Sequence, residues 1–234
     1  MPEIGRAISE LAPDIVCLQE VFFRGDRAKI EKGLINFGYR ATPGDYGLLL
    51  SKLGGLVVFS KLAIAETYFK KYEEQGPLIP IFSISDRVAG KGFLHVRVNW
   101  EEEMINVIDT HVLCNYRNKK QEFRAIEKQF EELGEYINKK IKPSEKIIFC
   151  GDLNINPGSQ IYENFIRKTG FYDPLNGKNE SSIHVAFRRP IFRDEAERLD
   201  YTCFRNFEKS KIKQKIVFEN IFLSDHMGIY SVYF

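Results

Sequence analysis

The side chains best suited to chemistry stand in two short motifs. Asp152 and Asn154 lie one residue apart after the apolar run 147–150, and Asp225 and His226 lie near the carboxyl end. Such a run predicts a buried strand, and residues one apart on an extended chain point to the same side. A carboxylate and an amide that face one point can hold a hard cation or a phosphoryl oxygen. The first motif therefore predicts a site for phosphate chemistry.

Two further predicted strands also end in polar residues. Glu20 stands at the end of the apolar run 14–21, where a buried carboxylate is costly unless a metal ion or a base pairs with it. His111 follows directly after the predicted strand 105–110. Four strand ends thus offer Glu20, His111, Asp152 with Asn154, and Asp225 with His226.

The elements that must position these residues follow from hydrophobic spacing. A long helix is predicted after His111, because apolar residues recur at positions 123, 126, 130, 133 and 137. Further strands are predicted at 55–60, 92–99, 201–204, 212–218 and 229–234. Helices and strands alternate without a low-complexity linker, which favours one compact domain over residues 1–234.

The ordered motifs resemble those of the endonuclease/exonuclease/phosphatase superfamily. That group includes pancreatic-type DNases, abasic-site endonucleases, inositol phosphatases and neutral sphingomyelinases. The matching positions cover nearly the whole chain, at residues 19–20, 110–111, 151–154, 198–201 and 224–226. The resemblance implies an α/β fold, a four-layer α/β sandwich in which two mixed β-sheets pack face to face with helices outside.

The resemblance also implies a metal-dependent phosphodiesterase. Mg²⁺, with Mn²⁺ as the alternative, would be held by Glu20 and Asp225 with assistance from Asn154. Oxygen ligands and the lack of a thiolate cluster suit Mg²⁺. The ion would neutralise a non-bridging phosphoryl oxygen and the charge that grows on the leaving oxygen.

The same resemblance implies a role for each remaining site residue. His226 would act as the general base on water, since the ordinary pKa of histidine, ~6.5, suits that task near neutral pH. Asp200 would orient His226, and Asp152 would position the water or the leaving group. His111 would donate a hydrogen bond to the phosphoryl oxygen as charge develops there.

The segment 86–96 is similar to neutral sphingomyelinases. Asp86 stands five residues before Lys91, which opens a Lys-Gly-Phe sequence at a predicted strand. The resemblance implies that this pair switches the enzyme between active and inactive arrangements, whereas the alternative is a surface loop with an incidental ion pair. Inositol phosphatases typically end in Cys-Asp-Arg, and abasic endonucleases place Tyr at the position of His111, so both branches fit less well.

The implied substrate is a phospholipid such as sphingomyelin. The apolar segment 75–82 could make peripheral membrane contact or could be a buried loop. With 234 residues and a net charge of +2, the chain lacks the broad cationic face of many nucleic-acid binders. A nuclease of the same fold, acting on DNA or RNA, is the alternative function. We expect a monomer.

One element of the family pattern is missing from the sequence. Family members begin with a strand that places an Asn near the metal, whereas residues 1–12 predict a helix with Pro13 behind it. We therefore expect the domain to lack its amino-terminal strand. An inactive truncated paralogue is a further alternative for the function.

Cysteine usage and hydropathy bear on the cellular compartment. The four cysteines form no CxxC pair and are predicted to be buried thiols. The sequence contains neither a membrane span nor a signal peptide pattern. It predicts a cytoplasmic protein by default and a secreted one if an upstream segment exists.

Overall fold

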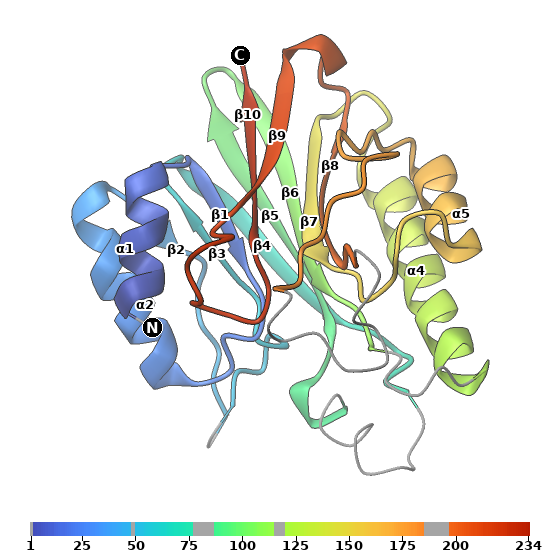
Figure 1. Cartoon of the computed structure of the whole chain (residues 1–234), viewed down its shortest axis with the longest axis horizontal. Helices are drawn as coiled ribbons and strands as arrows, with labels where there is room; N and C mark the ends of the chain where they lie inside the picture. Colours follow the sequence, from blue (N-terminus) through green and yellow to red (C-terminus); the bar gives the residue numbers. More distant parts are fainter. Residues whose placement is uncertain (1, 48–49, 77–86, 115–119, 185–196) are drawn as a thin grey trace.

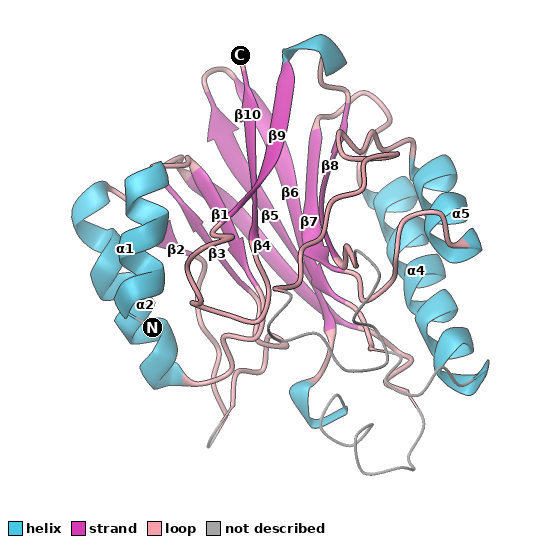
Figure 2. Cartoon of the chain, viewed as in Figure 1, coloured by secondary structure: helices cyan, strands magenta, loops and turns pink. Residues whose placement is uncertain are grey.

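The computed structural model describes residues 2–47, 50–76, 87–114, 120–184 and 197–234. Its strands lie between two pairs of helices (Figures 1 and 2). The longest helices of the described ranges are α1 (Pro2–Leu11) and α2 (Arg24–Leu34) on one side, and α4 (Lys120–Lys140) and α5 (Gln160–Thr169) on the other. Short 3-10 turns are present at η1 (Ile35–Phe37) and η4 (Lys209–Lys211).

The strands form three hydrogen-bonded groups. The first has the order β1 (Ile15–Leu18), β3 (Val57–Ser60), β2 (Arg40–Ala41). The second pairs β10 (Gly228–Tyr233) with β9 (Ile212–Val217). The third has five strands in the order β4 (Ile64–Lys71), β5 (Gly92–Trp100), β6 (Glu103–His111), β7 (Ile147–Asp152), β8 (Asp200–Arg205).

Three hydrophobic clusters hold these elements in four layers. One cluster packs α1 and α2 on the β1–β3 sheet through residues such as Ile8 and Phe59. A second packs α4 and α5 on the five-stranded sheet through residues such as Phe130 and Phe149. The third lies between the sheets, where Val58 meets strand β5. The predicted four-layer α/β sandwich is therefore confirmed.

The register of the five-stranded sheet aligns the predicted site residues. In β5–β6 Gly92 lies opposite His111, and in the parallel pair β6–β7 His111 lies opposite Asp152. Asp152 in turn lies opposite Asp200 of the antiparallel neighbour β8. Because directly opposed residues lie about 5 Å apart, one row across four strands brings these side chains to one end of the sheet.

Most elements agree with the sequence, with differences at their ends. The helices predicted at 1–12 and after His111 are α1 and α4. On α4 the predicted stripe is buried at Ile126, Leu133 and Ile137, whereas Phe123 in the first turn is 39% exposed. No helix in the described ranges has both the length and the apolar character needed to cross a bilayer.

Strand β1 is shorter than predicted and lies at an edge. It ends at Leu18 rather than Val21, because the backbone turns at Glu20, whose φ is 60°. Within the described chain, β1 pairs only with β3 and β10 only with β9. A hollow of about 620 Å³ lies between β1 and β10 and is lined mainly by apolar side chains of α1, β1, β8 and β10. The expected absence of a family strand stays a prediction.

Candidate active site

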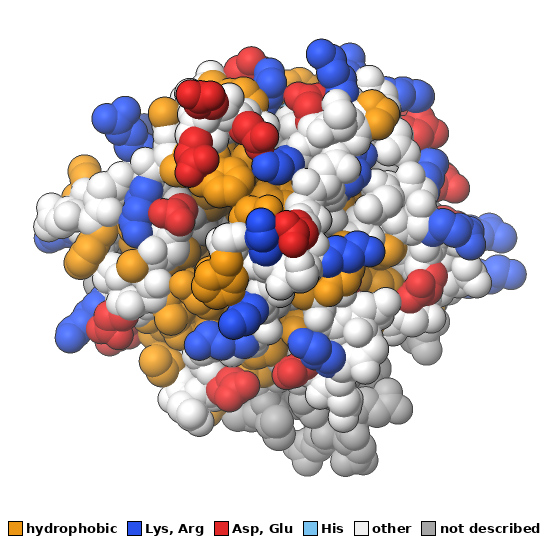
Figure 3. Space-filling model, turned by 90° about the horizontal axis from the view of Figure 1, so that it is seen from above, with side chains coloured by type: hydrophobic (Ala, Val, Ile, Leu, Met, Phe, Trp, Pro, Cys, Tyr) orange, Lys and Arg blue, Asp and Glu red, His pale blue; other side chains and the backbone are white. Residues whose placement is uncertain are grey.

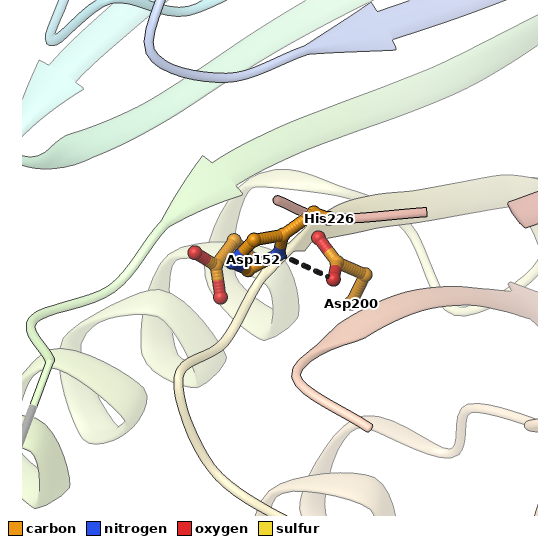
Figure 4. Close-up of side chains that lie close together, drawn as sticks. All are labelled: Asp152, Asp200 and His226. Atoms are coloured by element: carbon orange, nitrogen blue, oxygen red, sulfur yellow. Dashed lines mark hydrogen bonds and ion pairs between the residues drawn. The ribbon is translucent and has the colours of Figure 1, made fainter. Parts of the chain in front are cut away.

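The candidate site lies where strands β6, β7 and β8 meet the segment before β10. Asp152 ends β7, Asp200 begins β8, and His226 approaches from the chain just before β10 (Figure 4). One ligand atom from each of these three residues lies within 4.8 Å of the other two. Just before Asp152, Gly151 lets β7 pair closely with β6, because a Cβ there would lie 2.3 Å from the carbonyl oxygen of Thr110.

His226 and Asp200 form a close pair. The Nδ1 atom of His226 lies 2.7 Å from Oδ2 of Asp200. Burial by itself would lower the pKa of His226, but the hydrogen bond and charge of Asp200, together with Asp152 and Asp225, raise it to about 10. For Asp200, burial raises the pKa and outweighs the hydrogen bond and charge of His226, which lower it. With a pKa of about 10, His226 carries its proton at neutral pH and can donate it from Nδ1 to Asp200.

Asp152 is buried beside two basic side chains. Its Oδ2 lies 3.2 Å from Nε2 of His111, which also contacts the Nζ of Lys91. Burial would raise the pKa of Asp152, but the hydrogen bond from His111 and the charges of His111, His226 and Lys91 lower it to about 2. Asp152 is therefore a carboxylate at neutral pH, held inside the protein by basic neighbours.

Asn154 meets Asp152, but not on an extended chain as predicted. Asn154 has a φ of 51°, so the chain turns directly after β7. The turn lets the backbone N–H of Asn154 donate to Oδ1 of Asp152 at 2.9 Å. The amide nitrogen of the side chain donates to Oδ2 of Asp152 and to the carbonyl of Val112. The two side chains are therefore neighbours through an Asx-type turn rather than through strand alternation.

Glu20 lies at the exposed rim of the site. Its side chain is 67% exposed, because β1 ends before it and the backbone turns there. It still faces the site, with Oε1 3.9 Å from Nε2 of His111. Asp225 is also exposed, and its backbone carbonyl accepts a hydrogen bond from the N–H of His184. The predicted sharing of one metal ion by Glu20 and Asp225 stays a prediction.

The donor set fits a hard divalent cation. The described part of the site presents carboxylates of Asp152 and Asp200, the imidazole of His226, and the exposed carboxylate of Glu20 at its rim. Hard cations prefer such oxygen ligands, and buried carboxylates favour a cation that offsets their charge. The carboxylates suit a hard cation, and Mg²⁺ or Mn²⁺ as that cation stays a prediction.

A buried ion pair supports the strand that delivers Asp200, and sequence reasoning missed it. Arg198 is 1% exposed and its Nη2 lies 2.5 Å from Oδ2 of Asp173. The hydroxyl of Ser182 accepts from the backbone N–H groups of Leu199 and Asp200 at 2.9 and 3.1 Å. In the sequence, only Arg198 at the start of the 198–201 motif indicated this arrangement. Asp173 and Ser182 come from loops that are distant from it in the sequence.

Of the switch pair predicted from the sequence, the structure describes Lys91. Asp86 lies outside the described residues, as do residues 77–82 of the segment predicted to contact a membrane. Lys91 is 2% exposed and contacts His111. Lys91 therefore belongs to the site itself. Its predicted pairing with Asp86, and the catalytic roles predicted for the other residues, stay predictions.

The chain matches a known protein family over most of its length. Residues 3–226 match the model of the Endonuclease/Exonuclease/phosphatase family. Sphingomyelinase C of Listeria ivanovii is 29% identical over 182 residues, which are 74% of this chain and 52% of that protein. The chain thus spans about half the length of this relative.

Solved structures share the fold at low sequence identity. A double mutant of Staphylococcus aureus beta toxin with bound magnesium ions superposes with a TM-score of 0.76 at 20% identity, over 99% of this chain and 90% of that one. An AP endonuclease from Archaeoglobus fulgidus superposes with a TM-score of 0.70 at 17% identity, over 98% and 92%. Likeness at these identities establishes the fold and leaves the substrate open.

Proposed function

The chain belongs to the endonuclease/exonuclease/phosphatase family, and from this premise we propose that it is a metal-dependent phosphodiesterase acting on a sphingomyelin-type phospholipid. The observation that supports this most is the cluster of Asp152, Asp200 and His226 at adjoining strand ends. Such a cluster combines an oriented imidazole with carboxylates that attract a divalent cation. These are the parts that metal-assisted attack of water on phosphorus requires.

A divalent cation would supply charge neutralisation at the phosphoryl oxygen and the leaving oxygen. Glu20 and Asp225, with Asn154, are the residues proposed to hold it, and Asp152 lies close enough to share that task. Asn154 has its amide nitrogen fixed by Val112 and Asp152, so its amide oxygen is the atom left to face a ligand.

His226 is proposed to take a proton from the attacking water. Asp200 fixes the ring through Nδ1, which leaves Nε2 as the atom that exchanges a proton with water. With a pKa of about 10 the ring holds its proton at neutral pH, so it must lose this proton before it can act as a base. Positive charge bound beside Asp152 and Asp200 lowers that pKa, because it offsets the carboxylates that raise it.

His111, Lys91 and Asp152 are proposed to handle the phosphate. Lys91 and His111 contact each other and lie beside Asp152, so they bring positive charge and N–H groups close to this wall from buried positions. These donors would stabilise charge that develops on the phosphoryl oxygen. Asp152, ionised at neutral pH, would hold the water or the leaving group through a hydrogen bond.

Relatives and surface character favour a lipid over a nucleic acid. The Listeria relative is a sphingomyelinase C, and a Staphylococcus aureus relative, 22% identical over 188 residues, is a phospholipase C. Ile221 and Phe222 are 46% and 64% exposed in the loop that leads to His226, so they could enter a lipid surface. On the face shown in Figure 3, acidic and basic side chains are interspersed, unlike a broad cationic surface for nucleic acid.

A substrate panel tests the proposal. Purified protein with Mg²⁺ is incubated separately with sphingomyelin vesicles, abasic duplex DNA, plain duplex DNA and a small soluble phosphodiester. We expect release of choline phosphate from sphingomyelin at a rate well above any DNA cleavage. Efficient DNA cleavage with intact sphingomyelin would overturn the lipid assignment and support a nuclease. A chain inactive on all four, with a native fold by circular dichroism, would support an inactive paralogue.

A further inference from the structure

Two thiols meet between the two sheets, next to the site. Cys17 lies on β1 of the three-stranded sheet, and Cys150 lies on β7 of the five-stranded sheet. The two thiols share a hydrogen bond, and the hydroxyl of Thr202 also bonds Cys150. Cys17 packs against the apolar cluster between the sheets, as does Ile148, which lies on the same face of β7 as Cys150, so both thiols point into this layer.

Both residues border a space that is large enough for a small molecule. Cys17 and Cys150 are half-buried, and both line the hollow between β1 and β10. Cys203 is fully buried, and Cys114 is half-buried but does not line the hollow. Oxidation should therefore begin with the pair in the hollow and produce a bond between its two members.

We propose that Cys17 and Cys150 form a reversible disulfide that links the two sheets when the protein is exposed to a peroxide. One sulfur takes an oxygen atom from hydrogen peroxide to form a sulfenic acid, and one water leaves. The second thiol then displaces the hydroxyl group, so an S–S bond forms and a second water leaves. Two thiols are thereby oxidised, and the peroxide is reduced to two molecules of water.

The bond would act on the site through short backbone segments. Cys150 is two residues before Asp152, and Cys17 is three residues before Glu20. At the site, Oε1 of Glu20 lies 3.9 Å and Oδ2 of Asp152 lies 3.2 Å from Nε2 of His111. Drawing β1 toward β7 alters the separation of Glu20 and Asp152. Because a misplacement of about 1 Å can cost ~10²-fold in rate, we expect oxidation to lower hydrolysis at least tenfold.

The link would also stabilise the fold. It would join positions 17 and 150, which are far apart in sequence, and a cross-link over a long loop restricts the unfolded chain. For a chain of this size we expect the thermal midpoint to rise on the order of 5 °C on oxidation, and to fall back when dithiothreitol is added. Mass and thermal midpoint are independent of any enzymatic activity.

The experiment compares four proteins: wild type, Cys17→Ser, Cys150→Ser and, as the matched control, Cys114→Ser. Each is treated with a small excess of hydrogen peroxide, alkylated with iodoacetamide and digested without reduction. Mass spectrometry should find a peptide pair joined between Cys17 and Cys150 in wild type and Cys114→Ser, and in neither of the other two. Cys17→Ala is the second variant if Cys150→Ser fails to fold.

Only the activity readout depends on the proposed function. The peptide map and the thermal midpoint test the disulfide without it. Absence of the joined peptide pair in folded, peroxide-treated wild type would overturn the inference, as would oxidation that stops at sulfinic acid. A joined pair with unchanged hydrolysis would overturn the link to the site. If the reduced protein hydrolyses nothing, the proposed function fails while the peptide map and thermal midpoint still decide the disulfide.

Discussion

Replacing Asp200 by Asn removes the charge that orients His226 while nearly preserving side-chain volume. Nδ1 of His226 lies 2.7 Å from Oδ2 of Asp200, and the two side chains are 27% and 15% exposed. A largely buried hydrogen bond to a charged group contributes ~1.5–3 kcal/mol. If the imidazolium formed by proton abstraction loses all of this stabilisation, the rate falls by about 10 to 10²-fold. The loss should appear in kcat, because the interaction strengthens as the ring gains its proton.

The assay follows steady-state hydrolysis of a soluble phosphodiester by wild type, Asp200→Asn and a matched control. Asp45→Asn is suitable, because Asp45 is 58% exposed and forms a surface ion pair with Lys52 at 3.3 Å. An NMR titration without metal should show a lower pKa for His226 in Asp200→Asn than in wild type, since Asp200 is the main group that raises it. Activity of Asp200→Asn within threefold of Asp45→Asn would refute the reasoning.

Three further predictions concern metal, phosphate and pH. Chelation should abolish hydrolysis and Glu20→Gln should raise the Mg²⁺ concentration needed for half-maximal rate; an unchanged metal requirement would remove Glu20 from the metal site. Asp86→Ala and Lys91→Ala should each strongly lower sphingomyelin hydrolysis, with the double variant little worse; additive losses in a double-mutant cycle would show that the two act separately. In metal-free urea titrations, the stability due to the raised pKa of His226 should be complete below pH ~6.5 and lost as pH rises through about 10. The stability due to the lowered pKa of Asp152 should be present above ~3.9 and lost as pH falls through about 2, and a flat profile in both windows would contradict these shifts.

Strong periodicity made most of the fold predictable. On β5, Leu94, Val96 and Val98 alternate with polar residues and are buried between the sheets. Helix α2 gave little signal because only Ile30 and Leu34 are buried along it. Strand β4 was missed for a similar reason, since it is half-buried or exposed along its whole length. Elements that bury little apolar surface leave little pattern in the sequence.

The site was predictable at the strand ends and less so between them. Sequence reasoning placed His111, Asp152 and Asp200 in one site, and the sheet register aligns them. The contact of Lys91 with His111 depends on the pairing of Gly92 with His111, which hydrophobic pattern alone does not fix. The left-handed backbone at Glu20 was also not foreseen, because non-glycine residues rarely adopt it.

The most direct test of the account is release of choline phosphate from sphingomyelin vesicles, followed by phosphorus NMR. Wild type and His226→Ala are compared at saturating Mg²⁺, with circular dichroism to confirm that both are folded. The account predicts a choline phosphate signal that grows with wild type, disappears with a chelator, and grows ~10² to 10⁴-fold more slowly with His226→Ala. Equal rates for the two proteins would contradict the claim that this histidine and its carboxylates perform the hydrolysis.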